Sequence, residues 1–272
     1  MNTLKHILIT GGAGGLGDAA CRAFAQNGYT VFSLDLRTPK EARKGVVDIV
    51  CDITDEASVV AAHDTVTKTT DALDSVLHMA GIYHMDAFSE MKGGTWQKTM
   101  DVNATSAARV NRIFLPLVLN GKGRILITTS ELAGKRPLPF NGVYAASKTA
   151  LKAYCDALRP ELYLLGIPVI EIRPGAFATT LLDNANRAME EMCENSRYFS
   201  HSGEVFRRVM DTQMNTAKPP EKLAKTLLHA ASSRRPRLVY RANNNILLAL
   251  YSALPTRLGC FCLKLLLNRK KK

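Results

Sequence analysis

Strand-like and helix-like stretches alternate along the first 175 residues, and this alternation limits the fold more than any other feature of the sequence. Short apolar runs rich in Val, Ile and Leu are each followed by a longer stretch with apolar residues at helical spacing. Strands separated by helices pair in parallel, and the helices then cover both faces of the sheet. The pattern therefore predicts an α/β fold with a doubly wound parallel sheet and helices on both faces. The expected strands are 4–10, 29–35, one within 45–54, 73–81, 123–130, 167–175 and 236–240, and the expected helices are 15–28, 56–68, 95–120, 143–166 and 219–233.

No linker or change of composition divides this run, so a single domain is expected over residues 1–240, followed by an apolar and basic tail over 241–272. With 272 residues, the chain is long enough to bury a large core. The opening MNTLKHILIT enters an apolar strand at once and lacks a signal-peptide cleavage pattern. The six cysteines have neither disulfide-framework nor zinc spacing. These features favour a cytoplasmic protein without a metal site.

A glycine-rich loop, ITGGAGGLG at 9–17, connects the first expected strand to the first expected helix. Glycine lets the backbone turn tightly and approach a pyrophosphate at a helix N-terminus. Asp35 ends the next expected strand, 18 residues after Gly17. Its carboxylate can accept hydrogen bonds from an adenosine ribose and would repel a 2′-phosphate. The combination predicts a dinucleotide site that favours NAD over NADP; the alternative is an ordinary glycine turn and a solvated strand-end acid.

Tyr144 and Lys148 lie one turn apart in NGVYAASKTALKAY (141–154), so both project from one face of the expected helix. A cation beside a phenol lowers the phenol's pKa, which suits proton transfer at neutral pH. Ser130 ends the preceding strand at the carboxyl edge of the sheet, where open α/β sheets bind ligands. The three side chains predict a proton-transfer site beside a nicotinamide. The alternative is an amphipathic helix with a surface lysine, and Leu151 and Tyr154 are expected in the core in either case.

Several short motifs, in order, resemble the short-chain dehydrogenase/reductase family over residues 4–180. They are TGGAGGLG (10–17), CDITD (51–55), MAGI (79–82), DVNAT (101–105), the Tyr144-xxx-Lys148 pair and RPGAFAT (173–179). The resemblance implies a single Rossmann-like domain and an NAD(P)-dependent alcohol dehydrogenase or ketone reductase. The catalytic set that it implies is Ser130, Tyr144, Lys148 and Asn103. The cofactor-binding set that it implies is Gly11, Gly15, Leu16, Gly17, Asp35, Asp52, Ile53, Ala80, Gly81, Tyr144, Lys148, Pro174, Gly175 and Thr179.

The resemblance also implies a role for each catalytic residue. Tyr144 acts as general acid in reduction and as general base in oxidation. Lys148 lowers the pKa of that phenol and hydrogen-bonds the nicotinamide ribose. Ser130 holds and polarises the carbonyl, and Asn103 supports a water-linked proton path to Lys148. Ser130 lies 14 residues before Tyr144, one more than in many relatives, so Thr129 is the alternative for the serine role.

Several positions of the chain bear on the comparison with the family pattern. His78-Met79 stands where the family commonly has two asparagines, so the hydrogen bonds of those asparagines must be replaced or lost. His78 and His84 are expected to be structural. Gly14 stands where NADP-preferring relatives often carry a basic residue, which agrees with NAD. Arg37, two residues after the strand-end acid, is the alternative signal, since it could reach a 2′-phosphate.

The region after residue 180 is where substrate identity tends to be set in the resembling family. Residues 181–216, rich in Met, Leu, Phe and Tyr, are expected to form a helical lid over a hydrophobic pocket, or else a surface helical hairpin. In 244–272, Pro255, Arg257 and Lys264 interrupt the apolar stretches, so none reaches the ~18–20 residues of a membrane span. This tail is expected to pack as a C-terminal helix or an oligomer interface, or else to lie on an anionic membrane surface. Its ALPTRL segment resembles the retinol and 17β-hydroxysteroid dehydrogenase branch.

Basic charge is concentrated near the C-terminus: residues 197–272 hold 16 Lys/Arg and 3 Asp/Glu, whereas the rest of the chain is nearly neutral. No nucleic-acid-binding module accompanies this charge, so a nucleic-acid partner is not expected. The favoured function is interconversion of a secondary alcohol and a ketone on a hydrophobic substrate such as a hydroxysteroid, bile acid or retinoid. The alternatives are a reductase of a small metabolite (a 3-oxoacyl or sugar derivative) and a non-catalytic NAD(P)-binding regulatory protein. The resemblance also implies a homodimer or homotetramer.

Overall fold

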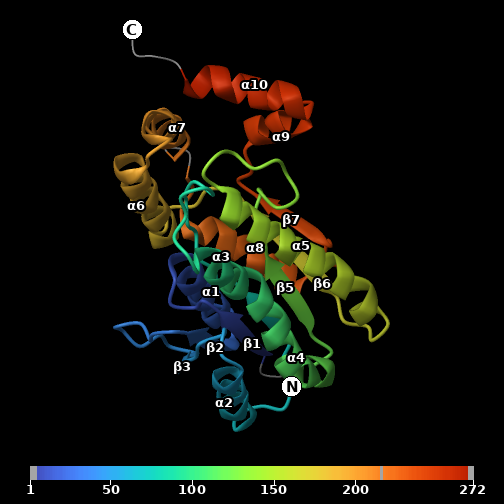
Figure 1. Cartoon of the computed structure of the whole chain (residues 1–272). Helices are drawn as coiled ribbons and strands as arrows, with labels where there is room; N and C mark the ends of the chain where they lie inside the picture. The colour runs from blue at the N-terminus through green and yellow to red at the C-terminus, as the bar shows by residue number, and fades with distance from the viewer. Residues whose placement is uncertain (1–4, 215–216, 269–272) are drawn as a thin grey trace.

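A seven-stranded parallel sheet forms the centre of the molecule (Figure 1). The computed structural model describes residues 5–214 and 217–268. The strands lie in the order β3-β2-β1-β4-β5-β6-β7, and every neighbouring pair is parallel. They are β1 (Lys5–Thr10), β2 (Tyr29–Asp35), β3 (Val46–Val50), β4 (Ser75–His78), β5 (Arg124–Thr128), β6 (Val169–Pro174) and β7 (Val239–Ala242). The predicted doubly wound parallel α/β sheet is confirmed.

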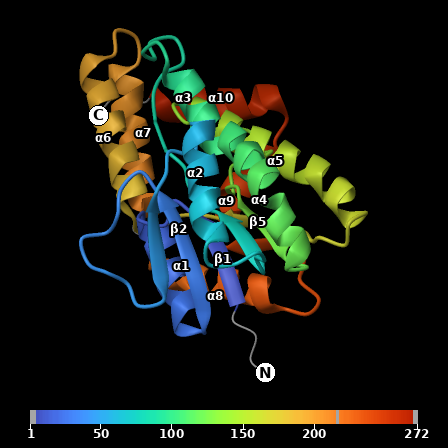
Figure 2. The ribbon, with the colours of Figure 1, turned by 90° about the horizontal axis from the view of Figure 1, so that it is seen from below.

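Helices cover both faces of this sheet, as Figure 2 shows with α1 and α8 on one side and α2, α4 and α5 on the other. These five are α1 (Gly15–Gln26), α2 (Glu56–Thr67), α4 (Ser106–Asn120), α5 (Gly142–Tyr163) and α8 (Pro220–Ser232). Successive side chains of a strand point to opposite faces, so β1 contributes to two cores. Ile7 and Ile9 pack with α1 and α8, whereas Leu8 packs with α2, α4 and α5. Leu151 of α5 is buried in the latter core and Tyr154 packs against it, as predicted.

The predicted long helix over 95–120 is present with those bounds, but it contains a π-helical turn that the sequence did not indicate. The segment consists of α3 (Thr95–Met100), a π-helical turn η1 (Asp101–Thr105) and α4. A π turn widens the helix by one residue and is common at functional sites. It carries Asn103, whose buried side chain bonds the backbone of Ile82 and the hydroxyl of Ser147 on α5. These hydrogen bonds stabilise the π turn, and they join it to segments that are distant in sequence. Helical periodicity alone therefore does not reveal the π turn.

Four helices gather at one end of the molecule, above the carboxyl ends of the strands (Figure 1). They are α6 (Thr180–Asn195), α7 (Ser200–Met214), α9 (Ile246–Ala253) and α10 (Thr256–Leu267). A third apolar cluster joins Met189 of α6, Phe206 of α7 and Leu267 of α10 to Phe140, which precedes α5. The tail thus contains two short helices separated at Pro255, and no helix within residues 5–214 and 217–268 combines the length and apolar character needed to cross a bilayer.

Parts of three predicted segments lie outside the described residues. These are the first residue of the predicted strand 4–10, residues 215–216 of the predicted lid, and the basic end of the tail at 269–272. The last strand, β7, ends at Ala242, two residues beyond the predicted end of the domain at residue 240.

Candidate active site

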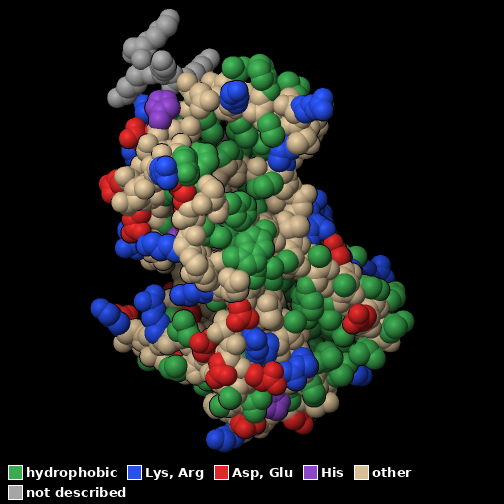
Figure 3. All heavy atoms as spheres, in the orientation of Figure 1, with side chains coloured by type: hydrophobic (Ala, Val, Ile, Leu, Met, Phe, Trp, Pro, Cys, Tyr) green, Lys and Arg blue, Asp and Glu red, His purple; other side chains and the backbone are tan. Residues whose placement is uncertain are grey.

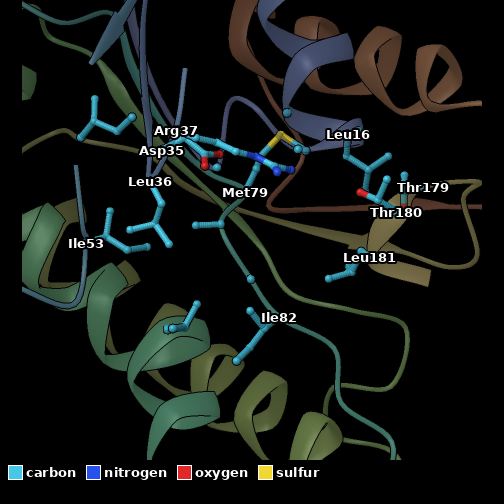
Figure 4. Close-up of a pocket in the computed structure, with 18 of the residues that line it drawn as sticks. Leu16, Asp35, Leu36, Arg37, Ile53, Met79, Ile82, Thr179, Thr180 and Leu181 are labelled. Atoms are coloured by element: carbon cyan, nitrogen blue, oxygen red, sulfur yellow. The ribbon is translucent and has the colours of Figure 1, made fainter. Parts of the chain in front are cut away.

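Two adjoining cavities lie at the carboxyl ends of the strands. The first cavity, of about 520 Å³, opens beside β1 and β4, where the strand order reverses and open α/β sheets bind ligands (Figure 4). The second cavity, of about 690 Å³, lies between the segment after β5, the start of α5 and the helices α6, α7 and α9. Leu16, Tyr83, Thr179 and Leu181 line both cavities, so a ligand in one can reach a ligand in the other.

The structure brings most predicted cofactor-binding residues to the first cavity. Those that line it are Gly11, Gly15, Leu16, Gly17, Asp35, Asp52, Ile53, Ala80, Gly81 and Thr179. Tyr144, Pro174 and Gly175 line the second cavity instead. Lys148 lines neither, because it is buried between α5 and β5.

The glycine loop is packed so tightly that side chains cannot replace two of its glycines. A Cβ on Gly17 would lie 2.0 Å from the carbonyl oxygen of Gly11, and a Cβ on Gly11 would lie 2.6 Å from the Cα of Ala80. Among the residues that the structure describes, no side chain caps the N-terminus of α1, whose capping position is Gly14. Uncapped N–H groups at a helix N-terminus suit a pyrophosphate. The loop therefore fits the dinucleotide that the sequence predicted.

Asp35 and Arg37 both line the first cavity (Figure 4). One carboxylate oxygen of Asp35, Oδ2, accepts a hydrogen bond of 3.0 Å from the backbone N–H of Ala13 in the glycine loop. The acid thus braces the loop as well as facing the cavity. The first cavity therefore contains both the carboxylate that favours NAD and, in Arg37, the cation that favours NADP.

Tyr144 is buried at the start of α5, and its phenol shares the second cavity with Ser130. Burial raises the pKa of Tyr144 to about 12, although a hydrogen bond with Ser130 opposes the shift. Lys148 Nζ lies 5.9 Å from the centre of the Tyr144 ring and donates to the carbonyl oxygen of Thr128 at 3.1 Å. Burial lowers the pKa of Lys148 to about 8. In the protein alone burial thus dominates the pKa of this phenol, and the role of Lys148 in lowering it stays a prediction.

The two candidates for the serine role face different surroundings. Ser130 follows β5 and lines the second cavity. Thr129 is buried, and its hydroxyl donates to Glu171 Oε1 at 2.8 Å and lies 3.2 Å from the carbonyl oxygen of Ile172. Only Ser130 of the pair faces a ligand space.

Asn103 lies behind the site rather than in a cavity wall. Its Oδ1 accepts from the Ile82 N–H at 2.8 Å, and its Nδ2 donates to the Ile82 carbonyl and the Ser147 hydroxyl, each at 2.9 Å. A Cβ on Gly81 would lie 3.2 Å from Asn103 Oδ1 and 3.5 Å from Lys148 Nζ. Asn103 thus fixes the loop after β4 against α5, beside the buried ammonium.

Comparison with known proteins decides the family. A family model described as short chain dehydrogenase matches residues 5–190, which is more than half of the chain. The chain belongs to the short-chain dehydrogenase/reductase family. It is therefore an NAD(P)-dependent oxidoreductase of the class that acts on alcohols and ketones.

Two curated relatives and one solved structure illustrate the likeness. Estradiol 17-beta-dehydrogenase 2 of Mus musculus is 28% identical over 261 residues, covering 87% of this chain and 67% of its own. The NADPH-dependent 1-acyldihydroxyacetone phosphate reductase of Schizosaccharomyces pombe is 30% identical over 248 residues, covering 89% and 80%. The ligand-free aldohexose dehydrogenase of Thermoplasma acidophilum superposes with a TM-score of 0.74 at 19% identity, covering 93% of this chain and 97% of its own. The last likeness concerns the fold alone.

The departure from the family's asparagine pair has a structural replacement. His78 is buried at the end of β4, and its Nε2 is 2.7 Å from Asn111 Oδ1 on α4. Asn111 in turn donates to the hydroxyl of Tyr154 on α5 at 3.0 Å. Burial lowers the pKa of His78 to about 4, so the ring is neutral. The chain of three side chains joins β4, α4 and α5, in keeping with a structural histidine.

Two residues of this short-chain dehydrogenase site were missed in the sequence. Tyr83 lines both cavities and stacks on Tyr144, with ring centres 4.2 Å apart and a 33° angle between the rings. Its hydroxyl donates to Asn141 Oδ1, and burial raises its pKa well above the usual range. Glu131 lines the second cavity directly after Ser130. The sequence offered one signal for each residue: Tyr83 directly follows the MAGI motif, and Glu131 directly follows Ser130.

Proposed function

We propose that the protein interconverts a secondary alcohol and a ketone on a hydrophobic substrate, with hydroxysteroids, bile acids and retinoids as the leading classes. The observation that carries this proposal is the second cavity, which adjoins the first and contains both Ser130 and Tyr144. Its remaining lining is mostly apolar: Leu16, Leu132, Leu138, Pro174, Ala176, Phe177, Leu181, Leu182, Val209, Met210, Ile246, Leu247 and Leu248. A large apolar cavity with a few convergent polar groups suits a hydrophobic substrate whose reacting oxygen meets the polar groups.

The side chains divide the proton chemistry between them. When bound, a nicotinamide dinucleotide supplies or accepts the hydride. Tyr144, whose raised pKa keeps the phenol protonated at neutral pH, donates its proton to the carbonyl oxygen in reduction. In oxidation the phenolate form of Tyr144 accepts the proton of the alcohol. The Ser130 hydroxyl hydrogen-bonds the same oxygen and orients it toward the phenol. Lys148 places a buried positive charge behind Tyr144, and Asn103 holds the loop that covers this ammonium.

The cofactor-binding residues act through backbone shape and charge. Gly11 and Gly17 let the loop approach the pyrophosphate, and Asp35 faces the adenosine ribose. Thr179 lines both cavities, so it is suited to hold the nicotinamide carboxamide between them.

Helices α6 and α7 form the lid in this proposal. Leu181 and Leu182 of α6 and Val209 and Met210 of α7 line the second cavity. Because both helices contribute apolar side chains to this cavity, we favour the substrate lid and not the alternative, a surface hairpin that does not contact the substrate. The side chains of residues 212–216 lie outside the described part of the segment.

The test is the change in absorbance at 340 nm with NADH or NADPH and a panel of ketosteroids, retinoids and bile-acid ketones, with 3-oxoacyl and sugar derivatives alongside. Turnover of the apolar panel supports the proposal, whereas faster turnover of the small metabolites favours the small-metabolite reductase. Tight cofactor binding without turnover of any member would instead favour a non-catalytic regulatory protein.

We also propose that NAD(H) is preferred, because Asp35 presents a carboxylate to the ribose end of the first cavity. The S. pombe relative is named NADPH-dependent, so the preference of this chain needs its own measurement. Asp35→Ser removes both the ribose acceptor and the repulsion of a 2′-phosphate, and it leaves Arg37 in place. We expect the ratio of kcat/KM for NADH to that for NADPH to fall by about 10–100-fold. Asp64→Ser on the exposed face of α2 is the matched control, and an unchanged ratio in Asp35→Ser would contradict the proposal.

The tail supports a proposal of peripheral membrane contact. On α10, Leu258, Phe261 and Leu265 are exposed at the i, i+3, i+7 spacing of a single helix face, and Arg257 and Lys264 accompany them. Residues 243–272 contain no Asp or Glu. Figure 3 shows apolar and basic side chains together over α9 and α10. An apolar helix face with basic neighbours suits an anionic lipid surface.

Phe261→Glu tests this contact, because it places a negative charge in the middle of the exposed apolar face. Sedimentation with vesicles of phosphatidylcholine containing phosphatidylglycerol should show that the wild type binds, and that the variant's partition coefficient is lower by about tenfold or more. Val60→Glu introduces the same charge on α2 and should bind like the wild type. Equal partition of the wild type into vesicles with and without phosphatidylglycerol would contradict the role of the basic residues.

We further propose a cytoplasmic homodimer or homotetramer, as the family membership favours. Light scattering of the purified protein measures its mass directly, and a monomer at micromolar concentration would contradict this proposal.

A further inference from the structure

The second cavity contains one charged side chain among its described lining residues, and that side chain is acidic. Glu131 lines this cavity together with Ser130 and Tyr144, and its charge helps to raise the pKa of Tyr144, so a carboxylate lies within electrostatic reach of the phenol. No Lys, Arg or His is present among the described residues that line this cavity. A ligand in this cavity therefore meets a negative charge without a lining cation to balance it.

Backbone contacts hold Glu131 firmly in place. Its N–H donates to the carbonyl of Pro174 at 2.9 Å, and its Oε2 accepts from the N–H of Asn245 at 2.5 Å. Its Oε1 lies beside Gly175, 3.1 Å from where a Cβ would stand. Burial raises the pKa of Glu131, while the Asn245 N–H and the charge of Lys135 oppose the shift. The carboxylate is thus fixed between β6 and the turn that leads into α9.

A second acceptor lies on that same turn. Asn244 lines the cavity, and its side-chain Oδ1 is buried without a hydrogen-bond partner among the described residues. Its neighbours fix the turn: Asn243 Nδ2 donates to the carbonyl of Ala176 at 2.6 Å, and Asn245 Oδ1 accepts from the N–H of Leu247 at 2.8 Å. A buried acceptor without a partner is costly, and a ligand that supplies a donor removes that cost.

We propose that Glu131 and Asn244 form an acceptor subsite that binds a hydroxyl or a protonated amine of an apolar substrate, close to the reacting carbonyl. The same subsite disfavours substrates that carry a carboxylate, sulfate or phosphate at this position, because like charges repel strongly where water is excluded. The inference deepens the proposed function and rests on it, since it names the polar group that distinguishes good substrates from poor ones. It separates hydroxylated or amino ketones from acidic ketones among the classes considered above.

The experiment uses ketones built on one medium-length alkyl chain, with a hydroxyl, methoxy, primary amine or carboxylate at the same carbon near the carbonyl. For the wild type with NADH, kcat/KM for the hydroxyl and amino ketones should exceed that for the methoxy ketone by about tenfold. The carboxylate should lie about 100-fold or more below the hydroxyl ketone.

Two variants assign the effect to the two acceptors. In Glu131→Gln, kcat/KM for the carboxylate ketone relative to that for the methoxy ketone should rise by about tenfold or more, because the negative charge is gone. The kcat/KM for the amino ketone should fall to that for the methoxy ketone. In Asn244→Ala the advantage of the hydroxyl should shrink, while the carboxylate penalty stays. Glu221→Gln on the exposed start of α8 is the control and should retain the wild-type ratios. Because each comparison is a ratio within one variant, a general loss of activity does not obscure it.

Binding separates failure of the subsite from failure of the proposed function. Calorimetry of the protein–NADH complex with octanol, octylamine and octanoate measures the same discrimination without turnover. If the ketones react, but kcat/KM is the same for the carboxylate ketone and the methoxy ketone, the subsite is overturned and the proposed function stands. If no ketone reacts, the proposed function fails, but the affinities of the three octyl ligands still test the subsite. Tighter binding of octanol and octylamine than of octanoate supports the subsite, and equal binding of all three overturns it.

Discussion

Tyr144→Phe is expected to lower kcat for ketone reduction by about 10²–10⁴-fold, the usual contribution of a positioned general acid. The substitution removes only the hydroxyl, so the ring keeps its contact with Tyr83 and its place in the wall of the second cavity. The Ser130 hydroxyl remains to orient the substrate oxygen, but it is left without the proton donor beside it. Binding of NADH and the thermal unfolding midpoint should change little.

The control is Tyr163→Phe, at the exposed end of the same helix, which should retain full activity. Stopped-flow measurement of NADH oxidation at saturating ketone isolates the chemical step from product release. A Tyr144→Phe variant that reduced ketones at a rate close to the wild type would exclude this tyrosine as the proton donor. Loss of both activity and NADH affinity would instead indicate damage to the fold, which the unfolding midpoint detects.

The sheet and the placement of the cofactor residues could be predicted because they follow from local patterns. Alternating strands and helices require parallel pairing, and the carboxyl ends of β1 and β4 then meet the glycine loop. Gly17 is glycine because its Cβ position lies within 2.0 Å of another backbone atom, and such close packing within one loop appears in the sequence as glycine spacing. The i, i+4 relation of Tyr144 and Lys148 is likewise local.

The remaining features depend on contacts between distant segments. The π turn at Asn103 is held by Ile82 and Ser147, which lie 21 and 44 residues away in sequence. The raised pKa of Tyr144 comes from burial, which the helical spacing of a lysine does not reveal. The position of the Glu131 carboxylate depends on the backbone N–H of Asn245, which lies 114 residues later in the sequence. Local sequence patterns thus predict which residues lie at the carboxyl ends of the strands, whereas the shape and charge of the second cavity depend on the packed structure.

Gly17→Ala is expected to weaken NADH binding by about 100-fold or more, because the added methyl group has no space on the helix side of the loop. Its Cβ would lie 2.0 Å from Gly11 O, 2.8 Å from Gly11 C and 2.9 Å from Gly12 Cα, all of them backbone atoms that cannot move aside independently. The loop must shift away from α1, and a displacement of about 1 Å removes the alignment of its N–H groups with the pyrophosphate. Overpacking of this kind also costs about 1–3 kcal/mol of folding free energy.

Fluorescence titration with NADH and urea unfolding of the same preparation measure the two effects separately. Gly93→Ala makes the identical chemical change where no atom of the described residues lies within 4 Å of the new Cβ, so affinity and stability should both remain close to the wild type. Raising the NADH concentration should restore part of the ketone-reducing activity of Gly17→Ala, since the Ser130 and Tyr144 hydroxyls are untouched. If Gly17→Ala bound NADH with wild-type affinity, the glycine loop would not be the pyrophosphate site, and the first cavity would need another ligand to explain its shape.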